Sequence, residues 1–311
     1  MEQKGARRSL MGIKKIVVER TRKNFIKLCN DADIPRMREE KYPEDVHAIR
    51  DLTYMDDGRV EHRFDLYFPS GVSFENMEKK TIILDIHGGG FVYGLKEINM
   101  CFNMHVARRT KLPVASVNYT LVPDGSIVNS IHEIVHAIKH IKETYGVEDL
   151  FLMGDSAGGF LAYTVWAVLS DKDIRHEYNC FHYPKVNIHG LIMISPGTCD
   201  SQNYIKALDE VYFPDDPLNQ VPSYARDLTL LTKKCKKAPP KILLTTSDLD
   251  SMLQETTYFY EYLSKNNHDV RLFNGTTKED GNKLYHVFPV GHPDWEESDE
   301  PLRMIEELVV Q

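Results

Sequence analysis

The chain has 311 residues, of which 42% are hydrophobic and 27% are charged, proportions typical of a globular protein with a sizeable core. Its net charge of −8 argues against nucleic-acid binding through a basic face, because phosphate contacts need clustered positive charge. The length allows one large domain or two ordinary ones.

Short apolar runs rich in β-branched residues alternate with stretches of helical periodicity along most of the chain. The first predicted helix is Ile13–Cys29. The predicted strands that follow are Ala48–Met55, His62–Phe68, Thr81–Ile86, Pro113–Asn118, Leu150–Gly154, Ile188–Ile194, Lys241–Thr246 and Asp269–Asn274. The helices predicted between the later strands are Ile127–Tyr145, Gly158–Leu169 and Leu253–Asn266. This alternation predicts an α/β fold with a mostly parallel sheet and helices on both faces. The turn Asp56-Asp57-Gly58 predicts a hairpin that supplies an antiparallel edge.

Two regions, 1–46 and 197–238, do not follow the rhythm of strands and helices. The second mixes aromatic residues with prolines, namely Tyr204, Tyr212, Phe213, Tyr224, Pro214, Pro217 and Pro222. We expect both regions to fold over the carboxyl ends of the strands, where ligands bind in open α/β sheets. The basic N-terminal helix could instead lie on a membrane surface, but its mixed charges and modest apolar face disfavour this.

The strongest chemical motif lies in Phe151–Gly159, where an apolar strand leads into Gly154-Asp155-Ser156-Ala157-Gly158 and then into a helix pattern. This G-x-S-x-G motif requires a sharp strand-to-helix turn that exposes the serine hydroxyl. The glycines are needed because the serine occupies a strained conformation and neighbouring chains pass close by. We therefore predict that Ser156 is the nucleophile of a serine hydrolase, rather than part of a merely structural turn.

A second motif, His87-Gly88-Gly89-Gly90-Phe91-Val92-Tyr93-Gly94, directly follows a predicted strand. Consecutive glycines leave backbone N–H groups free to converge on an anionic oxygen. With the N–H of Ala157, those of Gly88 and Gly89 are expected to form an oxyanion hole. A flexible glycine turn is the structural alternative, whereas a phosphate-cradling loop is disfavoured because neither GK[ST] nor GxGxxG follows.

Together these motifs resemble those of the hormone-sensitive lipase family of α/β-hydrolase carboxylesterases. The matching segments are His87–Phe91, Gly154–Gly159 and Val117–Pro123, the last similar to the family's N-Y-x-L-x-P segment. The resemblance, over residues 60–290, implies an α/β-hydrolase fold with an eight-stranded sheet and a helical cap. It also implies no cofactor and no metal, and hydrolysis of small or short-chain acyl esters through an acyl-enzyme. We expect a single domain over residues 1–311, with a cap from 1–46 and 197–238 and a catalytic core from 47–196 and 239–311.

A catalytic triad of this kind needs an acid and then a histidine after the serine. The predicted strand Lys241–Thr246 is followed by two candidate acids, Asp248 and Asp250. The family pattern favours Asp250, although the sequence departs from the usual D-P-L form. For the base, Leu284-Tyr285-His286-Val287-Phe288 matches the family's H-V-F setting, so we expect His286 and keep His292 as the alternative.

A competing motif, His132-Glu133-Ile134-Val135-His136, reads literally as the H-E-x-x-H signature of zinc metallopeptidases. On a helix, however, Ile131, Ile134, Val135, Ile138 and Ile141 form the buried stripe, and His132, His136 and His140 fall on the opposite side. No downstream third ligand is evident. A non-catalytic binding protein that keeps a hydrolase shape is a further alternative, because a fold alone never certifies a function.

Partners and location follow from composition. The five cysteines are dispersed without CxxC spacing, which favours reduced thiols and a cytoplasmic protein. No apolar run is long enough for a secretory leader or a membrane span, so we expect no stable membrane anchor. A small-molecule ester is the expected partner, nucleic acid is not, and a homodimer is compatible with the sequence.

Overall fold

The computed structural model of the chain describes residues 2–198 and 221–310. Within them an eight-stranded sheet has the order β1-β2-β4-β3-β5-β6-β7-β8. Its strands are β1 (Val46–Thr53), β2 (Arg63–Pro69), β3 (Thr81–Ile86), β4 (Val114–Val117), β5 (Asp149–Asp155), β6 (Asn187–Ile194), β7 (Lys241–Ser247) and β8 (Val270–Gly275). From β4 to β8 all neighbours pair in parallel, whereas β2 is antiparallel to both β1 and β4. The predicted α/β fold and its antiparallel edge are confirmed.

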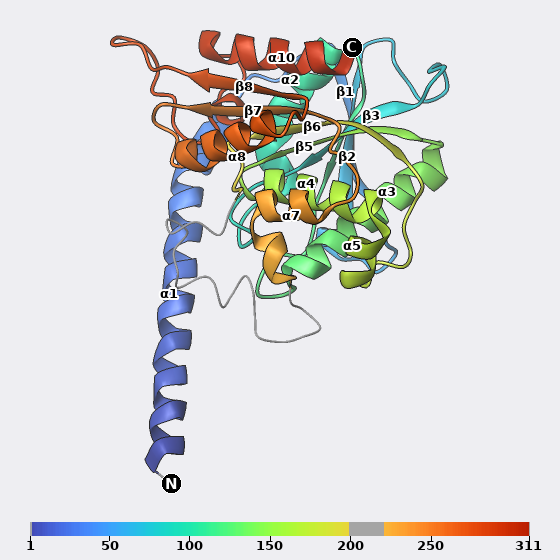
Figure 1. Cartoon of the computed structure of the whole chain (residues 1–311). Helices are drawn as coiled ribbons and strands as arrows, with labels where there is room; N and C mark the ends of the chain where they lie inside the picture. Colours follow the sequence, from blue (N-terminus) through green and yellow to red (C-terminus); the bar gives the residue numbers. More distant parts are fainter. Residues whose placement is uncertain (1, 199–220, 311) are drawn as a thin grey trace.

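Helices cover both faces of the sheet (Figure 1). The described α-helices are α1 (Glu2–Glu39), α2 (Met100–Thr110), α3 (Ile127–Tyr145), α4 (Ala157–Ser170), α5 (Lys172–Glu177), α7 (Leu228–Lys234), α8 (Leu253–Lys265), α9 (Phe288–Gly291) and α10 (Asp299–Val310). Short 3-10 turns are η1 (Val60–His62), η2 (Lys96–Asn99), η4 (Ser223–Arg226) and η5 (Glu296–Ser298). α2 and α10 pack on one face, while α3, α4, α7 and α8 lie on the other.

The core has two halves, one on each side of the sheet, because the inner strands are apolar at successive positions and bury both faces. In β5, Leu150 and Leu152 face α3 and α4, while Phe151 and Met153 face α2 and α10. Helix α3 begins at the predicted residue, since Ser126 accepts a hydrogen bond from the N–H of Asn129 in a capping box. The continuous apolar runs of the inner strands explain why the strand predictions hold to within a few residues.

The N-terminal helix is longer than predicted, running from Glu2 to Glu39 instead of Ile13–Cys29. In Figure 1 its N-terminal part extends away from the sheet, and its C-terminal part lies beside the body. Arg36 links the C-terminal part of α1 to the body, because its guanidinium donates a hydrogen bond to the carbonyl of Ile98 (3.0 Å). Locally, the same guanidinium donates to Asp33 (3.1 Å) and forms an ion pair with Glu40. Only the C-terminal part of region 1–46 therefore lies against the core.

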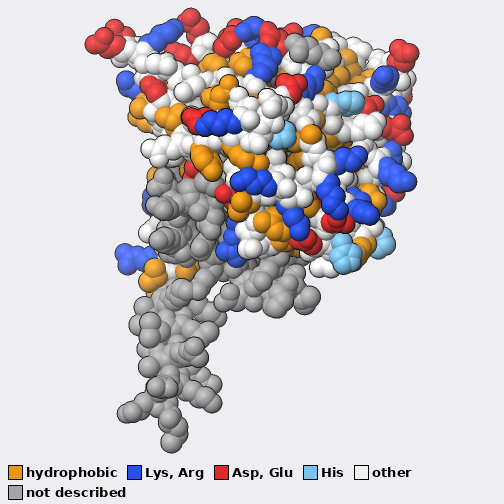
Figure 2. All heavy atoms as spheres, in the orientation of Figure 1, with side chains coloured by type: hydrophobic (Ala, Val, Ile, Leu, Met, Phe, Trp, Pro, Cys, Tyr) orange, Lys and Arg blue, Asp and Glu red, His pale blue; other side chains and the backbone are white. Residues whose placement is uncertain are grey.

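The second predicted cap region, 197–238, is described only in part, and residues 199–220 lie outside the described residues. The described remainder forms η4 and α7, which packs against α4 and α8. No helix among the described residues is long and apolar enough to cross a membrane. On the face shown in Figure 2, acidic and basic side chains are interspersed, with small hydrophobic patches between them.

Candidate active site

Ser156 stands at the turn between β5 and α4, as the sequence predicts. Its backbone has φ 50° and ψ −119°, a strained conformation for a residue with a side chain. A Cβ on Gly158 would lie 1.9 Å from the carbonyl oxygen of Ile86, and one on Gly154 would lie 2.4 Å from the backbone of Gly158. The turn is therefore closed so tightly that only glycine fits at these two positions.

The hydroxyl of Ser156 lies 2.9 Å from Nε2 of His286, and Nδ1 of the same ring lies 2.7 Å from Oδ1 of Asp250. Asp250 follows β7 and is held by the N–H of Met252 (2.9 Å) and the hydroxyl of Thr246 (2.9 Å). Burial raises the pKa of this carboxyl, but hydrogen bonding and charge from His286 outweigh it, so the pKa is lowered overall. The three side chains thus form one continuous hydrogen-bonded row.

The two alternative residues lie elsewhere. The carboxylate of Asp248 is exposed and accepts hydrogen bonds from the N–H (3.0 Å) and hydroxyl (2.7 Å) of Thr277. The ring of His292 stacks on Trp295 at a centroid distance of 3.8 Å. Of each candidate pair, Asp250 and His286 are the members that take part in the hydrogen-bonded row with Ser156.

The glycine loop, residues 87–94, faces Ser156 but differs from the prediction in one respect. The N–H of Gly88 donates to Oδ1 of Asp155 (2.9 Å), so it is not free to stabilise an oxyanion. Gly89 and Gly90, at φ 99° and 56°, line the pocket in front of Ser156. The expectation that the N–H of Gly88 is free is therefore wrong.

A pocket of about 730 Å³ opens in front of Ser156 and His286. Its walls are mostly apolar, and its apolar residues include Phe25, Leu28, Cys29, Ile98, Met252 and Val290. The first three belong to α1, so the N-terminal helix supplies one wall of the pocket. The sequence leads us to expect region 1–46 over the carboxyl ends of the strands. It does not show which residues of α1 reach the pocket, because contacts between α1 and the loops of the sheet leave no local pattern.

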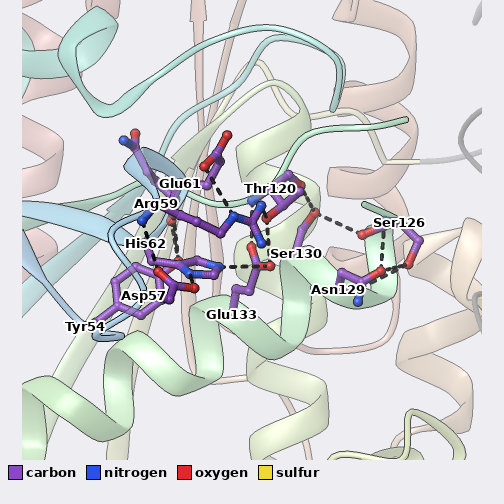
Figure 3. A network of polar contacts seen from close by, with 11 residues as sticks. Tyr54, Asp57, Arg59, Glu61, His62, Thr120, Ser126, Asn129, Ser130 and Glu133 are labelled. Carbon is purple, nitrogen blue, oxygen red and sulfur yellow. Dashed lines mark hydrogen bonds and ion pairs between the residues drawn. The ribbon is translucent and has the colours of Figure 1, made fainter. Parts of the chain in front are cut away.

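The H-E-x-x-H residues make contacts of a structural kind. Glu133 accepts hydrogen bonds from the N–H (2.6 Å) and hydroxyl (2.7 Å) of Thr120, and His62 lies between it and Asp57 (Figure 3). His132 lies 2.6 Å from the carbonyl oxygen of Tyr178 instead. Across residues 2–198 and 221–310, no group of three or more metal-ligating side chains is arranged to hold a metal ion.

The profile of a family described as having the alpha/beta hydrolase fold matches residues 83–279, more than half of the chain. The chain belongs to the α/β-hydrolase family. Among solved structures, esterase B from Lactobacillus rhamnosis superposes with a TM-score of 0.83 at 21% identity, covering 96% of this chain and 97% of that one. An esterase from Rhizomucor miehei superposes with a TM-score of 0.69 at 21% identity, covering 92% and 90%.

Similar sequences include a probable carboxylesterase 6 from Arabidopsis thaliana, 31% identical over a 144-residue alignment, with 42% of this chain and 40% of that protein covered. The hormone-sensitive lipase of Bos taurus is 31% identical over 91 residues, 28% of this chain and 12% of the lipase. The resemblance to the hormone-sensitive lipase group of α/β hydrolases is thus confirmed. The matched stretches span less than half the length of these relatives.

Proposed function

We propose that the chain is a serine-dependent carboxylesterase that works through an acyl-enzyme. The observation that carries this proposal is the hydrogen-bonded row of Ser156, His286 and Asp250 at the pocket, in the chain order Ser, Asp, His. Relatives named as carboxylesterases and an acetyl esterase of Salmonella schwarzengrund support the same reaction. A non-catalytic binding protein would not need this alignment.

In the proposed mechanism His286 removes the proton of Ser156 as the hydroxyl attacks the ester carbonyl. Asp250 orients the imidazole and stabilises its cation. His286 then protonates the leaving alcohol, and water hydrolyses the acyl-enzyme by the same route.

The tetrahedral oxyanion is held, in this proposal, by the backbone N–H groups of Gly89, Gly90 and Ala157. Gly89 and Gly90 line the pocket, and Ala157 is the first residue of α4, whose N–H has no acceptor within the helix. The positive end of the α4 dipole points the same way and favours the developing charge.

We infer that the substrates are small or short-chain acyl esters. Support comes from the apolar walls of the pocket and from esterase B of Lactobacillus rhamnosis, which was crystallised with a C4-C4 tributyrin phosphonate. We also propose that α1 and residues 197–238 act as a cap over a single catalytic domain. A cytoplasmic location is part of the proposal, supported by the free thiols of Cys29, Cys101, Cys180 and Cys235. A homodimer stays a prediction.

The test is covalent labelling with an aryl alkylphosphonate, followed by peptide mass spectrometry. We expect stoichiometric modification of Ser156, loss of hydrolysis of p-nitrophenyl acetate, and full activity in the presence of EDTA. Activity that survives complete labelling, or that EDTA abolishes, would contradict the proposal.

A further inference from the structure

A cluster of buried polar side chains lies next to the glycine loop, and two of its members, Asn99 and Asp155, reach the wall of the pocket. The proposed mechanism gives none of them a chemical step. Its members are Asp85 in β3, Ser116 in β4, Asn99 at the end of η2, Asn103 in α2 and Asp155 at the end of β5. All are buried, on the α2 side of the sheet. Buried polar groups need partners, so a cluster of this size next to a reactive site calls for an explanation.

Asp155 connects the two halves of the candidate site. It directly precedes Ser156, and its Oδ1 accepts the N–H of Gly88 at 2.9 Å. A Cβ on Gly88 would lie 2.4 Å from Oδ2 of Asp155, so the loop rests directly on this carboxyl. One side chain therefore sets the separation between the nucleophile turn and the glycine loop.

Asp155 is itself fixed from behind. The amide nitrogen of Asn99 lies 2.8 Å from Oδ1 of Asp155 and 3.3 Å from both carboxyl oxygens of Asp85. Asp85 accepts two more hydrogen bonds, from the amide of Asn103 (2.7 Å) and the hydroxyl of Ser116 (2.9 Å). These contacts tie Asn99 to two strands and a helix, the rigid part of the fold.

The surroundings of Asp85 and Asp155 favour one negative charge on the pair of carboxyls rather than two. Among the described residues no cation forms an ion pair with either Asp85 or Asp155, and one amide group bridges both carboxyls. Burial raises the pKa of both, and the charge of Asp155 adds to the effect on Asp85. Other titratable groups that face the pair are Tyr67 in β2 and, on the Asp155 side, His286. Asp155, which also accepts a backbone N–H, is the better site for the single negative charge.

We propose that Asp85 and Asn99 are positioning residues for the glycine loop, and that they act through Asp155. This inference rests on the proposed esterase function. Asp85 fixes the amide of Asn99, Asn99 fixes the carboxylate of Asp155, and Asp155 holds Gly88. The N–H groups of the next two residues then stay aimed at the position of the oxyanion. Donors preorganised in this way act in the transition state, and a displacement of about 1 Å can cost about a hundredfold in rate.

The test compares Asp85→Ala and Asn99→Ala with a matched control, Asp171→Ala. Asp171 is also a buried aspartate that accepts backbone N–H groups, but it caps α5 away from the pocket. For p-nitrophenyl acetate we expect kcat to fall about tenfold or more in Asp85→Ala and Asn99→Ala, with KM changed by less than about threefold. The control should lose thermal stability and keep its kcat.

A second measurement uses a trifluoromethyl ketone, whose adduct with a serine carries an oxyanion, and the matching methyl ketone, which mimics the substrate. We expect affinity for the first to fall in parallel with kcat/KM and affinity for the second to stay constant. If both positioning variants keep kcat within about twofold of an active wild type, this inference is wrong and the esterase proposal stands. An inactive, unlabelled wild type would remove the esterase proposal itself. If Asp85→Ala does not fold, the kcat of Asn99→Ala, which leaves both carboxyls in place, tests the inference by itself.

Discussion

The buried carboxyl of Asp85 should make the stability of the protein depend on pH in a definite direction. Burial raises its pKa to about 7, opposed by the hydrogen bond from Asn103 and reinforced by the charge of Asp155. In the unfolded chain an aspartate has a pKa of about 3.9. The folded protein therefore binds this proton more tightly than the unfolded chain. Its contribution to stability is complete below pH about 4 and is lost as pH rises through about 7.

The size of the effect follows from the shift. A difference of roughly three pKa units corresponds to about 4 kcal/mol, of which roughly 2–3 kcal/mol is lost between pH 5 and pH 8. Asp85→Asn removes this ionisation while keeping the shape of the side chain. We therefore expect the free energy of unfolding of the wild type, relative to this variant, to fall by that amount over the interval.

The assay is urea unfolding of both proteins at several pH values between 5 and 8, with linear extrapolation to water. Ionisations of groups away from Asp85, such as that of Asp250, cancel in the difference. The ionisation of Asp155 is coupled to that of Asp85 and is therefore part of the measured change. A difference in unfolding free energy that stays constant across this range would refute the assignment of a raised pKa to Asp85.

Three further outcomes follow from the site. Asp250→Asn should lower kcat by a factor of about 10³–10⁴, because Nδ1–H of His286 loses its carboxylate acceptor. Asp248→Asn, at an exposed residue two positions away, should change kcat less than about twofold. Equal losses in the two variants would contradict the choice of Asp250 as the triad acid. Gly158→Ala should prevent folding or lower Tm severely, because the new Cβ would meet the Ile86 carbonyl oxygen. The control Gly58→Ala, with open space around it, should lower the free energy of unfolding by only about 1 kcal/mol. Similar Tm values for both variants would disprove the clash. Phe25→Ala, which removes an aromatic side chain from the pocket wall, should raise KM for p-nitrophenyl butyrate more than KM for p-nitrophenyl acetate. If the ratio of these two KM values is unchanged, the acyl chain does not contact Phe25.

Much of the fold could be predicted because its signals are local. The inner strands bury both faces, so their apolar runs stand out, and α3 is bounded by a capping residue and by Gly146 at its end. No helix is predicted at α2, α5, α7, α9 or α10. α2 is short, and Asn103, His105, Arg108 and Arg109 interrupt its apolar residues, which obscures the helical apolar period.

The site residues likewise fall into those that a short motif reveals and those that only the three-dimensional structure reveals. Ser156 and the glycine loop lie next to their strands in sequence, so a short motif reveals them. The choice between Asp250 and Asp248 depends on which side chain turns inward after β7, and only the three-dimensional structure gives that direction. Gly88 was assigned to the oxyanion hole because its N–H looked free in sequence, but the buried carboxylate of Asp155 occupies it. Such a bond joins residues 67 positions apart and leaves no local trace.

The central claim is that Ser156 is the nucleophile of an esterase, and the most direct test is the turnover of Ser156→Ala. With p-nitrophenyl acetate, the account predicts a loss in kcat on the order of 10⁶ relative to the wild type, by analogy with other serine hydrolases, with the folded state unchanged by circular dichroism. Hydrolysis by a folded Ser156→Ala within about tenfold of the wild-type rate would contradict it.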